Sequence, residues 1–220
     1  MGMESESILL EFIGVTDKAK GFGLKNIDFK LERGYILGLV GKNGSGKTTL
    51  LHHIVKNKRN YQGEILFEGK NIKNQEVYLK DHVAFISEEQ EFFEALSLKE
   101  NGDLLGSFYT NWSMESFLQT LEQFHLWEKQ KIAGLSRGEY MKFQLAFAMA
   151  HQAKLYLVDE ATAGMDVVFR KEFYQILKKI VLADASAIIA THNETEVYKN
   201  MDYIANMEDG RLSSFLENVQ

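Results

Sequence analysis

The chain has 220 residues, 45% of them hydrophobic, which is enough for one large domain or for two lobes that share a core. With 25 lysines and arginines against 31 aspartates and glutamates, the net charge of −6 argues against nucleic acid as the main partner. The absence of cysteine excludes disulfides and thiolate metal sites. No apolar stretch approaches the roughly 18 residues that span a bilayer, and the acidic segment 1–6 is not typical of a signal peptide, so we expect a cytoplasmic location unless a partner tethers the chain.

The first part of the chain is predicted to form a small antiparallel sheet. Ile27, Phe29 and Leu31 alternate with charged residues, which is the pattern of a half-buried strand. The segments 8–13 and 63–70 are also strand-like, and the second of them leads into a turn. Together the three strands indicate a sheet with one solvated face.

Continuous apolar runs predict strands that are buried on both faces of a parallel sheet. These runs are 36–40, 83–86, 155–158 and 187–190. From about 97 to 150 the pattern is helical, with possible capping boxes at Ser97 and Ser136, and an apolar stripe over 169–180 is typical of a helix packed on a core. A helical insertion is therefore expected to interrupt the parallel sheet.

The segment 41–48 fits the phosphate-binding loop G-x-x-x-x-G-K-[ST]. It lies between a predicted strand and a predicted helix. In this arrangement the backbone N–H groups of the loop and the N-terminus of the helix face a bound phosphate. Lys47 would reach the β- and γ-phosphates, and Thr48 would hold Mg²⁺. A chance glycine turn is the alternative, and the flanking elements argue against it. The predicted phosphate-binding residues are Gly41, Asn43, Gly44, Ser45, Gly46, Lys47, Thr48 and Thr49.

Two of the predicted parallel strands end in residues suited to phosphate chemistry. The strand 155–158 is followed by Asp159 and Glu160. Asp159 would bind Mg²⁺ through water, and Glu160 would polarise the attacking water. The strand 187–190 is followed by Thr191 and His192, and we expect His192 to contact the γ-phosphate. The alternative for His192 is an ordinary polar residue of the surface or core.

The segment 135–139, Leu-Ser-Arg-Gly-Glu, indicates the class of protein. It resembles the signature Leu-Ser-Gly-Gly-Gln of the nucleotide-binding domains of ATP-binding cassette (ABC) transporters, and it lies between the two phosphate-site motifs, as in that family. The segment 163–166, Ala-Gly-Met-Asp, is similar to the family's D-loop. The resemblance extends from about 8 to 216, over nearly the whole chain.

This resemblance implies a head-to-tail dimer with two composite ATP sites. Ser136 and Gly138 would complete the γ-phosphate shell of the partner subunit, and Asp166 would communicate across the dimer. A capped helix N-terminus at Ser136 is the purely structural alternative, and it is compatible with this role because such an end also attracts anions.

The family fold is α/β, a P-loop NTPase with a RecA-like core, an antiparallel β-subdomain and an inserted α-helical subdomain. We expect all three within a single domain over 1–220. The antiparallel subdomain would comprise about 1–33 and 60–80. The core would comprise 34–59, 81–90 and 152–220, and the helical subdomain with the signature would comprise 91–151.

Departures from the family pattern bear on the function. Glu88 stands where a glutamine is usual, in the shell of the nucleotide and its metal, and Arg137 is a basic third signature residue. Both residue types at these positions resemble those of bacterial drug and antimicrobial-peptide exporters. The alternative for Glu88 is an ordinary solvated acid. The usual adenine-stacking aromatic is missing, because Ala19 falls near its place and Phe22 is the nearest aromatic. We therefore expect weak discrimination between ATP and GTP.

The sequence thus predicts a Mg²⁺-dependent ATPase with Lys47, Glu160 and His192 as catalytic residues. It would dimerise on ATP with a second ABC ATPase subunit, identical or not. It would power export of a drug, a lipid or an amphipathic peptide through a separate membrane permease subunit, at the cytoplasmic face of the membrane. The rival is a soluble ABC ATPase that acts on ribosomes, DNA ends or cluster assembly, which the acidic charge and the single cassette disfavour.

The membrane subunit is expected to dock beside Glu88. Phe92, Phe93 and Leu96 lie there among acidic residues, and they are suited to receiving a helix of the partner. Ordinary packing under the helical lobe is the alternative for these three side chains.

Overall fold

The structure, a computed structural model, describes residues 7–18, 21–56, 60–88, 91–161, 165–193, 197 and 199–218. Within these residues the strands are β1 (Ile8–Asp17), β2 (Ile27–Glu32), β3 (Ile36–Val40), β4 (Tyr61–Phe67), β5 (Lys70–Asn71), β6 (Val83–Ser87), β7 (Leu155–Asp159), β8 (Ser186–Thr191), β9 (Tyr203–Glu208) and β10 (Arg211–Glu217). The α-helices are α2 (Lys47–Val55), α3 (Glu76–His82), α4 (Leu98–Gly106), α5 (Met114–Gln123), α6 (Arg137–Ala150) and α7 (Val167–Leu182). Short 3₁₀ turns occur at Ile72–Asn74 and Ile132–Gly134.

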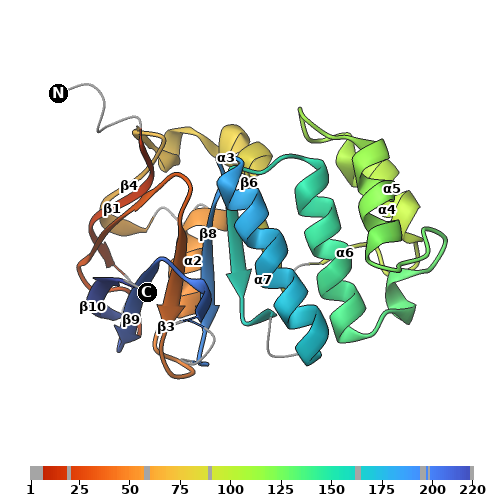
Figure 1. The fold of residues 1–220 in the computed structure, drawn as a ribbon. Coiled ribbons are helices and arrows are strands. Elements are labelled where there is room, and N and C mark those ends of the chain that lie inside the picture. The colour runs from red at the N-terminus through yellow and green to blue at the C-terminus, as the bar shows by residue number, and fades with distance from the viewer. Residues whose placement is uncertain are drawn as a thin grey trace.

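The described strands form two sheets (Figure 1). A six-stranded sheet has the order β10-β9-β3-β8-β7-β6, and its strands are parallel except for β10, which pairs antiparallel with β9. A four-stranded antiparallel sheet has the order β2-β1-β4-β5. The predicted α/β fold is confirmed, and the carboxyl ends of the parallel strands meet at one edge.

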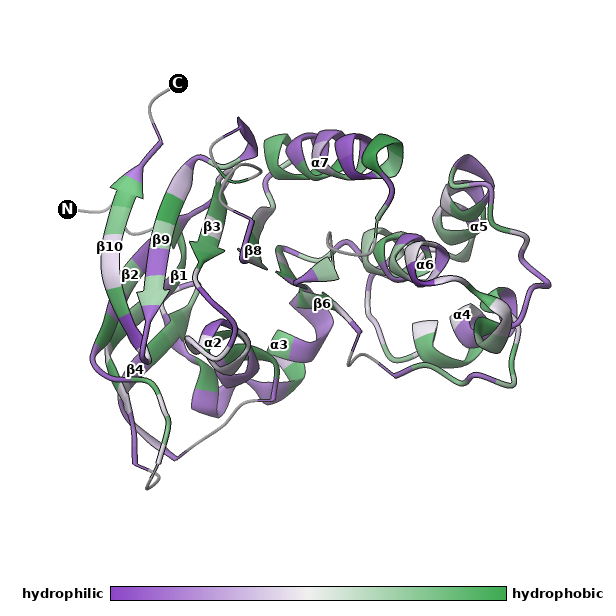
Figure 2. Ribbon diagram, turned by 90° about the horizontal axis from the view of Figure 1, so that it is seen from below, coloured by the Kyte–Doolittle hydropathy of each residue, from purple (hydrophilic) through white to green (hydrophobic). Residues whose placement is uncertain are grey.

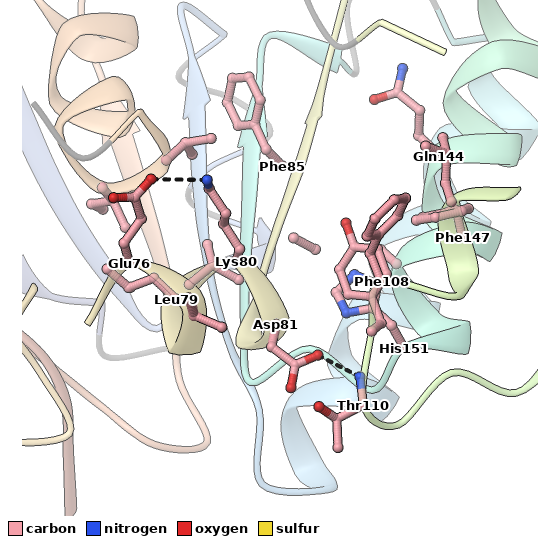
Figure 3. A pocket seen from close by; sticks show the side chains of 18 of the residues that line it. Glu76, Leu79, Lys80, Asp81, Phe85, Phe108, Thr110, Gln144, Phe147 and His151 are labelled. Atoms are coloured by element: carbon pink, nitrogen blue, oxygen red, sulfur yellow. Dashed lines mark hydrogen bonds and ion pairs between the residues drawn. The ribbon is translucent and has the colours of Figure 1, made fainter. Parts of the chain in front are cut away.

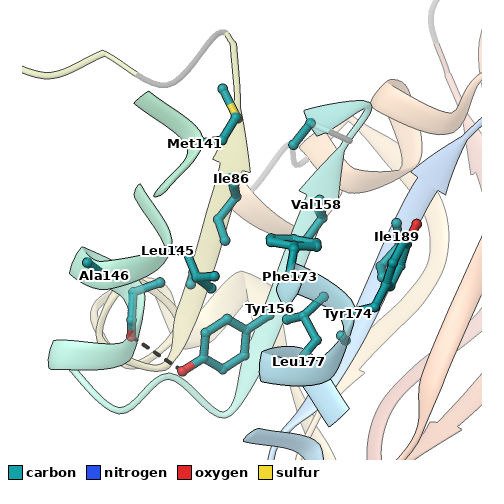
Figure 4. Close-up of a cluster of buried hydrophobic side chains, with 14 of the residues drawn as sticks. Ile86, Met141, Leu145, Ala146, Tyr156, Val158, Phe173, Tyr174, Leu177 and Ile189 are labelled. Carbon is teal, nitrogen blue, oxygen red and sulfur yellow. Dashed lines mark hydrogen bonds between the residues drawn. The ribbon is translucent and has the colours of Figure 1, made fainter. Parts of the chain in front are cut away.

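Each central strand divides its apolar side chains between two cores. In β7, Leu155 and Leu157 pack with α2 and the four-stranded sheet, whereas Tyr156 and Val158 pack with α6 and α7. Figure 4 shows the second core, in which Tyr156 lies between α6 and α7 and its hydroxyl donates to the Ala148 carbonyl over 3.4 Å. Because both faces are buried, these strands are apolar throughout, as the continuous runs in the sequence indicate.

The helices α4, α5 and α6 gather at the end of the molecule away from the four-stranded sheet (Figure 1, Figure 2). At the start of α6, Ser136 Oγ accepts the Glu139 N–H at 3.3 Å, and the Glu139 carboxylate accepts the Ser136 N–H at 2.8 Å. Ser97 and Glu100 form the same arrangement at the start of α4. Both predicted capping boxes are confirmed, so local sequence determines where these helices begin.

Sequence analysis predicts neither the β9–β10 hairpin nor α3. The strand β9 mixes apolar, small and polar residues, and it is defined by its parallel pairing with β3 rather than by its own pattern. The helix α3 runs across 80–81, where the sequence places a domain boundary. The predicted boundaries between the antiparallel subdomain, the core and the helical subdomain stay a prediction.

A cluster of charged groups joins the two sheets at Glu68, in the turn that follows β4. Its carboxylate accepts hydrogen bonds from Arg33, from the Tyr78 hydroxyl on α3, and from Lys154 at the start of β7 over 2.8 Å. Burial acts to raise the pKa of Glu68, but the hydrogen bonds from Lys154, Tyr78 and Arg33 outweigh it and lower the pKa to about 2. The charged carboxylate is therefore part of the folded structure.

We expect Glu68→Gln to lower the free energy of unfolding at pH 7 by about 1–3 kcal/mol, because charged partners lose their carboxylate. The folded-state pKa lies below the unfolded value of about 4.3, so the stabilisation is present above that value and is lost as the pH falls towards 2. Urea unfolding measured from pH 7 to pH 3 should show that the difference in free energy of unfolding between wild type and Glu68→Gln becomes smaller as the pH falls. The matched control is Glu115→Gln on α5, which is exposed and should show little gap at any pH. A gap that is constant with pH would contradict this role of the charge.

Candidate active site

A glycine-rich loop over 41–46 joins β3 to α2. Gly46 is the N-cap of α2 with a φ of 114°, a left-handed conformation that favours glycine, and no side-chain hydrogen bond caps the helix there. At Gly41 a Cβ would lie 2.4 Å from the Met207 carbonyl oxygen, so a side chain has no room. The first N–H groups of α2 are thus left for an anion.

Lys47, the first residue of α2, points back into this loop. Its side chain is only 4% exposed, and Nζ donates to the carbonyl oxygens of Gly41 at 2.7 Å and Lys42 at 3.2 Å. Nζ also lies 3.2 Å from Glu160 Oε1. A buried ammonium needs such partners, because its desolvation is costly.

Glu160 links the lysine to His192. Its other oxygen, Oε2, lies 3.1 Å from His192 Nδ1, and its backbone N–H donates to the Ala190 carbonyl over 3.0 Å. The residue has a φ of 48°, which turns the chain at the end of β7. The fold therefore brings together Lys47, Glu160 and His192, which the sequence predicts as catalytic residues.

The oxygen ligands predicted for Mg²⁺ come from the same edge of the sheet. Thr48 follows Lys47 on α2, and Asp159 ends β7. A hydroxyl and a carboxylate suit Mg²⁺, which commonly takes only one or two protein ligands and fills its shell with water and phosphate oxygens. Ser45 Oγ is buried without a hydrogen-bond partner among the described residues, as fits a donor to a phosphate oxygen.

Glu88 and Arg137 form an ion pair with one another, and both side chains are about half exposed. Glu88 follows β6 and Arg137 is the first residue of α6, so the pair joins the end of a core strand to the signature helix. Two turns along α6, the buried Gln144 amide donates to the Ser87 carbonyl at 2.9 Å and accepts the Ser87 N–H at 3.0 Å. The sequence does not predict this second connection, and the metal contact expected of Glu88 stays a prediction.

Ser136 and Asp166, expected to face a partner subunit, are both helix N-caps in this chain. Asp166 Oδ1 accepts the N–H groups of Val168 and Phe169 at 2.9 Å each. Gly138 lies in the first turn of α6, next to the capping box. Their roles across a dimer stay predictions, and Ala163 and Gly164 of the D-loop lie outside the described residues.

Phe22 lies against the phosphate-binding loop. A Cβ on Gly46 would be 3.3 Å from the Phe22 ring, and the side chain is 54% exposed. Ala19 lies outside the described residues. The β9–β10 turn also contacts the loop, since the Gly210 N–H donates to the Ser45 carbonyl over 2.9 Å. No sequence signal indicates that contact, because the two segments are distant along the chain.

Comparison with known proteins agrees with this geometry. The family model described as ABC transporter matches residues 24–163, more than half of the chain. The chain belongs to the ABC transporter family. Its fold is that of solved ABC cassettes: a structure titled as the ATP-binding subunit of an ABC transporter has a TM-score of 0.87 at 23% identity, covering 95% of this chain and 90% of that one.

Curated relatives of the ABC domain include proteins with different named cargoes. The ABC transporter ATP-binding protein YtrB of Bacillus subtilis is 28% identical over 88% of this chain, which spans 66% of YtrB. The SkfA peptide export ATP-binding protein SkfE of the same organism is 30% identical over 87% of this chain and 82% of its own. The L-arabinose transport ATP-binding protein AraG of Geobacillus stearothermophilus is 30% identical over 95% of this chain and 43% of its own.

A cavity of about 500 Å³ lies between α3, β6 and α6 (Figure 3). Of the three predicted docking residues only Phe92 lines it, and its ring packs edge-on against Phe143 at 4.7 Å. Phe93 is exposed and Leu96 is partly buried outside the cavity lining. Phe92 therefore packs against the helical lobe and also lines the cavity. No helix in the described part of the chain has the length and apolar character to cross a membrane.

We expect Lys47→Ala to weaken ATP binding by at least about tenfold and to abolish hydrolysis, because the one buried ammonium of the loop is lost. Lys42→Ala is the matched control: this lysine is in the same loop, but its side chain is exposed. Titration with ATP and release of phosphate measure the two effects. Equal losses in both variants would show that the loop needs charge in general rather than an ammonium at Lys47.

Proposed function

We propose that this ABC ATPase is a Mg²⁺-dependent subunit that dimerises on ATP and drives export through a separate membrane subunit. The observation that carries the catalytic part is the arrangement of Lys47, Glu160 and His192 beside the glycine loop, with contacts of 3.2 Å and 3.1 Å. The predicted nucleotide-binding residues of this site are those of the loop and of α2, from Gly41 to Thr49.

Binding of ATP would replace the Glu160 carboxylate by phosphate as the anionic partner of Lys47. Lys47 forms an ion pair with Glu160 and donates hydrogen bonds to two loop carbonyls. The β- and γ-phosphates carry more negative charge than one carboxylate, and the N-terminus of α2 attracts them to the same place. Lys47 would then bind phosphate, and Phe22 would stack on the base. Stacking tolerates any base, which is the reason to expect weak discrimination between ATP and GTP.

Hydrolysis would depend on the carboxylate that Lys47 releases. Glu160 Oε1 becomes able to accept a hydrogen bond from the attacking water and so to orient it. His192, with Nδ1 still beside Glu160 Oε2, would direct its other ring nitrogen, Nε2, at the γ-phosphate. Thr48 and Asp159 would hold Mg²⁺, with Glu88 as a further ligand once it leaves Arg137. Bound Mg²⁺ would offset the charge on the phosphates.

A second ABC subunit would complete the site. The capped N-terminus of α6 offers N–H groups to an anion, and Arg137 adds a positive charge next to it. Ser136, Gly138 and Arg137 would therefore contact the triphosphate bound to the partner, and Asp166 would lie at the dimer interface. Separation of Arg137 from Glu88 would accompany this closure.

The membrane subunit would dock in the cavity between α3 and α6. Phe85, Phe108 and Phe147 line it together with the acids Asp81 and Glu91 and with the ion pair of Glu76 and Lys80 (Figure 3), so an apolar segment with basic residues is the complementary partner. His151 in its wall is buried, which lowers its pKa to about 4, so the ring is neutral at pH 7.

Export of an amphipathic peptide, a lipid or a drug is the direction that we propose. SkfE, a relative named for peptide export, supports it, as do the unusual Glu88 and Arg137. The protein would then work at the cytoplasmic face of the membrane.

We expect Glu160→Gln to keep ATP binding and to lower the hydrolysis rate by about 10²–10⁴-fold, because the amide cannot take the proton of the attacking water. Glu208→Gln is the matched control, since Glu208 is an exposed acid in a pocket beside the loop that Asn43 and His192 also line. Single-turnover phosphate release measures the rate. Wild-type hydrolysis by a purified Glu160→Gln protein would overturn the assignment of Glu160.

We expect Phe108→Asp to abolish copurification of a membrane protein with the tagged chain while ATP binding is unchanged. Phe108 is 78% exposed at the rim of the cavity, so the substitution need not disturb the core. Trp127→Asp is the matched control, because Trp127 is 65% exposed and lies outside that cavity. Membrane capture that survives Phe108→Asp would place the docking site elsewhere. Absence of any membrane partner with the wild-type chain would favour a soluble ABC ATPase.

A further inference from the structure

A buried acid–histidine pair connects β1 to the helix that follows the phosphate-binding loop. His53 on α2 is fully buried, and its Nε2 lies 2.8 Å from Asp17 Oδ1 at the end of β1. Its Nδ1 lies 2.7 Å from the Thr49 carbonyl oxygen, one turn back along α2. The ring thus spans from the start of α2 to the side chain of Asp17.

Asp17 is also the centre of the short turn that carries Phe22. Its Oδ2 accepts the Leu24 N–H over 2.8 Å, and its own N–H donates to the Leu24 carbonyl over 2.9 Å. A Cβ on Gly23 would lie 2.7 Å from the Asp17 Cβ, so the backbone wraps closely around this side chain. Asp17 therefore holds Leu24 by two hydrogen bonds and packs closely on Gly23, the residue that follows Phe22.

The other side of the turn is fixed by the β9–β10 turn. The Lys25 N–H donates to the Gly210 carbonyl over 2.8 Å, and a Cβ on Gly210 would lie 2.1 Å from the Gly23 carbonyl oxygen. Phe22 is thus an exposed ring next to Gly46, and the backbone that follows it is held at Leu24 by Asp17 and at Lys25 by Gly210. An aromatic side chain that is held in place before binding loses less entropy when a ligand stacks on it.

We propose that Asp17 and His53 are positioning residues for nucleotide base binding. They hold the turn at 22–24 relative to α2, so that the Phe22 ring is presented to a base whose phosphates lie in the loop. The proposal rests on the proposed binding of ATP at this loop. The purely structural role, a connection between β1 and α2, makes a different prediction, because it would affect the binding of triphosphate and of base together.

The test compares binding of ATP with binding of inorganic tripolyphosphate, which lacks a base, both with Mg²⁺. Asp17→Asn keeps the size of the side chain but leaves one acceptor oxygen for two donors, the Leu24 N–H and His53. His53→Phe keeps a ring against Tyr61 and removes both ring nitrogens, and with them the contacts to Asp17 and Thr49. Asp28→Asn is the matched control, because Asp28 likewise accepts two N–H groups, from Gly14 at 2.6 Å and from the Asn26 side chain at 3.0 Å, but at another turn.

Asp17→Asn and His53→Phe should each weaken ATP binding by about tenfold, the scale of one lost base–aromatic contact, and should change tripolyphosphate binding by less than about twofold. Phe22→Ala should show the same selective loss. In the Phe22→Ala background, Asp17→Asn should cause no further loss, because it acts through the ring. Asp28→Asn should leave both affinities unchanged.

Each other outcome overturns a defined part of the account. If Phe22→Ala weakens ATP selectively and Asp17→Asn does not, the positioning role is wrong and the base contact stands. If Asp17→Asn weakens ATP and tripolyphosphate equally, or adds fully to Phe22→Ala, the pair is only structural. If Phe22→Ala leaves the ratio of the two affinities unchanged, the proposed base contact and the positioning role both fail, while binding of tripolyphosphate still reports on the loop.

Discussion

The site depends on one electrostatic constraint, the need to satisfy a buried ammonium. Lys47 is 4% exposed and lies inside a loop whose backbone curls back on it. A charge in that position needs an anionic or dipolar partner, and here it has Glu160 together with two loop carbonyls. The groups that the proposed chemistry requires are therefore already in contact, and a triphosphate has to compete with a carboxylate of the protein.

The rest of the fold makes this contact possible. β3 leads into the loop and β7 ends next to Glu160, with β8 between them in the sheet, so parallel pairing brings both ends to one edge. The signature helix α6 is connected to the adjacent edge strand β6 through Gln144 and Ser87, both of them buried. A shift of α6 would therefore be expected to move Ser87 and, with it, Glu88, the next residue along the chain.

The sequence predicts the features that local pattern determines. Apolar runs identify β3, β6, β7 and β8, and the capping boxes identify the starts of α4 and α6. The loop motif together with Asp159, Glu160 and His192 predicts a common site, because parallel strand ends meet at one edge. In these cases the structure is determined by residues near each other in the chain, or by the general rule that the carboxyl ends of parallel strands lie at one edge of a sheet.

The remainder depends on contacts between distant segments. β9 has no strong pattern of its own and is defined by β3, and the contact of Gly210 with Ser45 has no signature in either segment. The ion pair of Glu88 with Arg137 could not be predicted, because Glu88 follows β6 and Arg137 belongs to the signature segment, and neither segment indicates a contact with the other. Likewise the buried contact of Asp17 with His53 joins a strand end to a helix face, and neither residue type is unusual at its position.

The central claim is that Lys47 exchanges Glu160 for the triphosphate. The most direct measurement is a crystal structure of this chain with Mg²⁺ and a non-hydrolysable ATP analogue. The account predicts that Lys47 Nζ lies within hydrogen-bond distance of the β- and γ-phosphates and has moved away from Glu160 Oε1, now 3.2 Å away. An intact contact between Lys47 and Glu160, with the phosphates bound elsewhere, would contradict it.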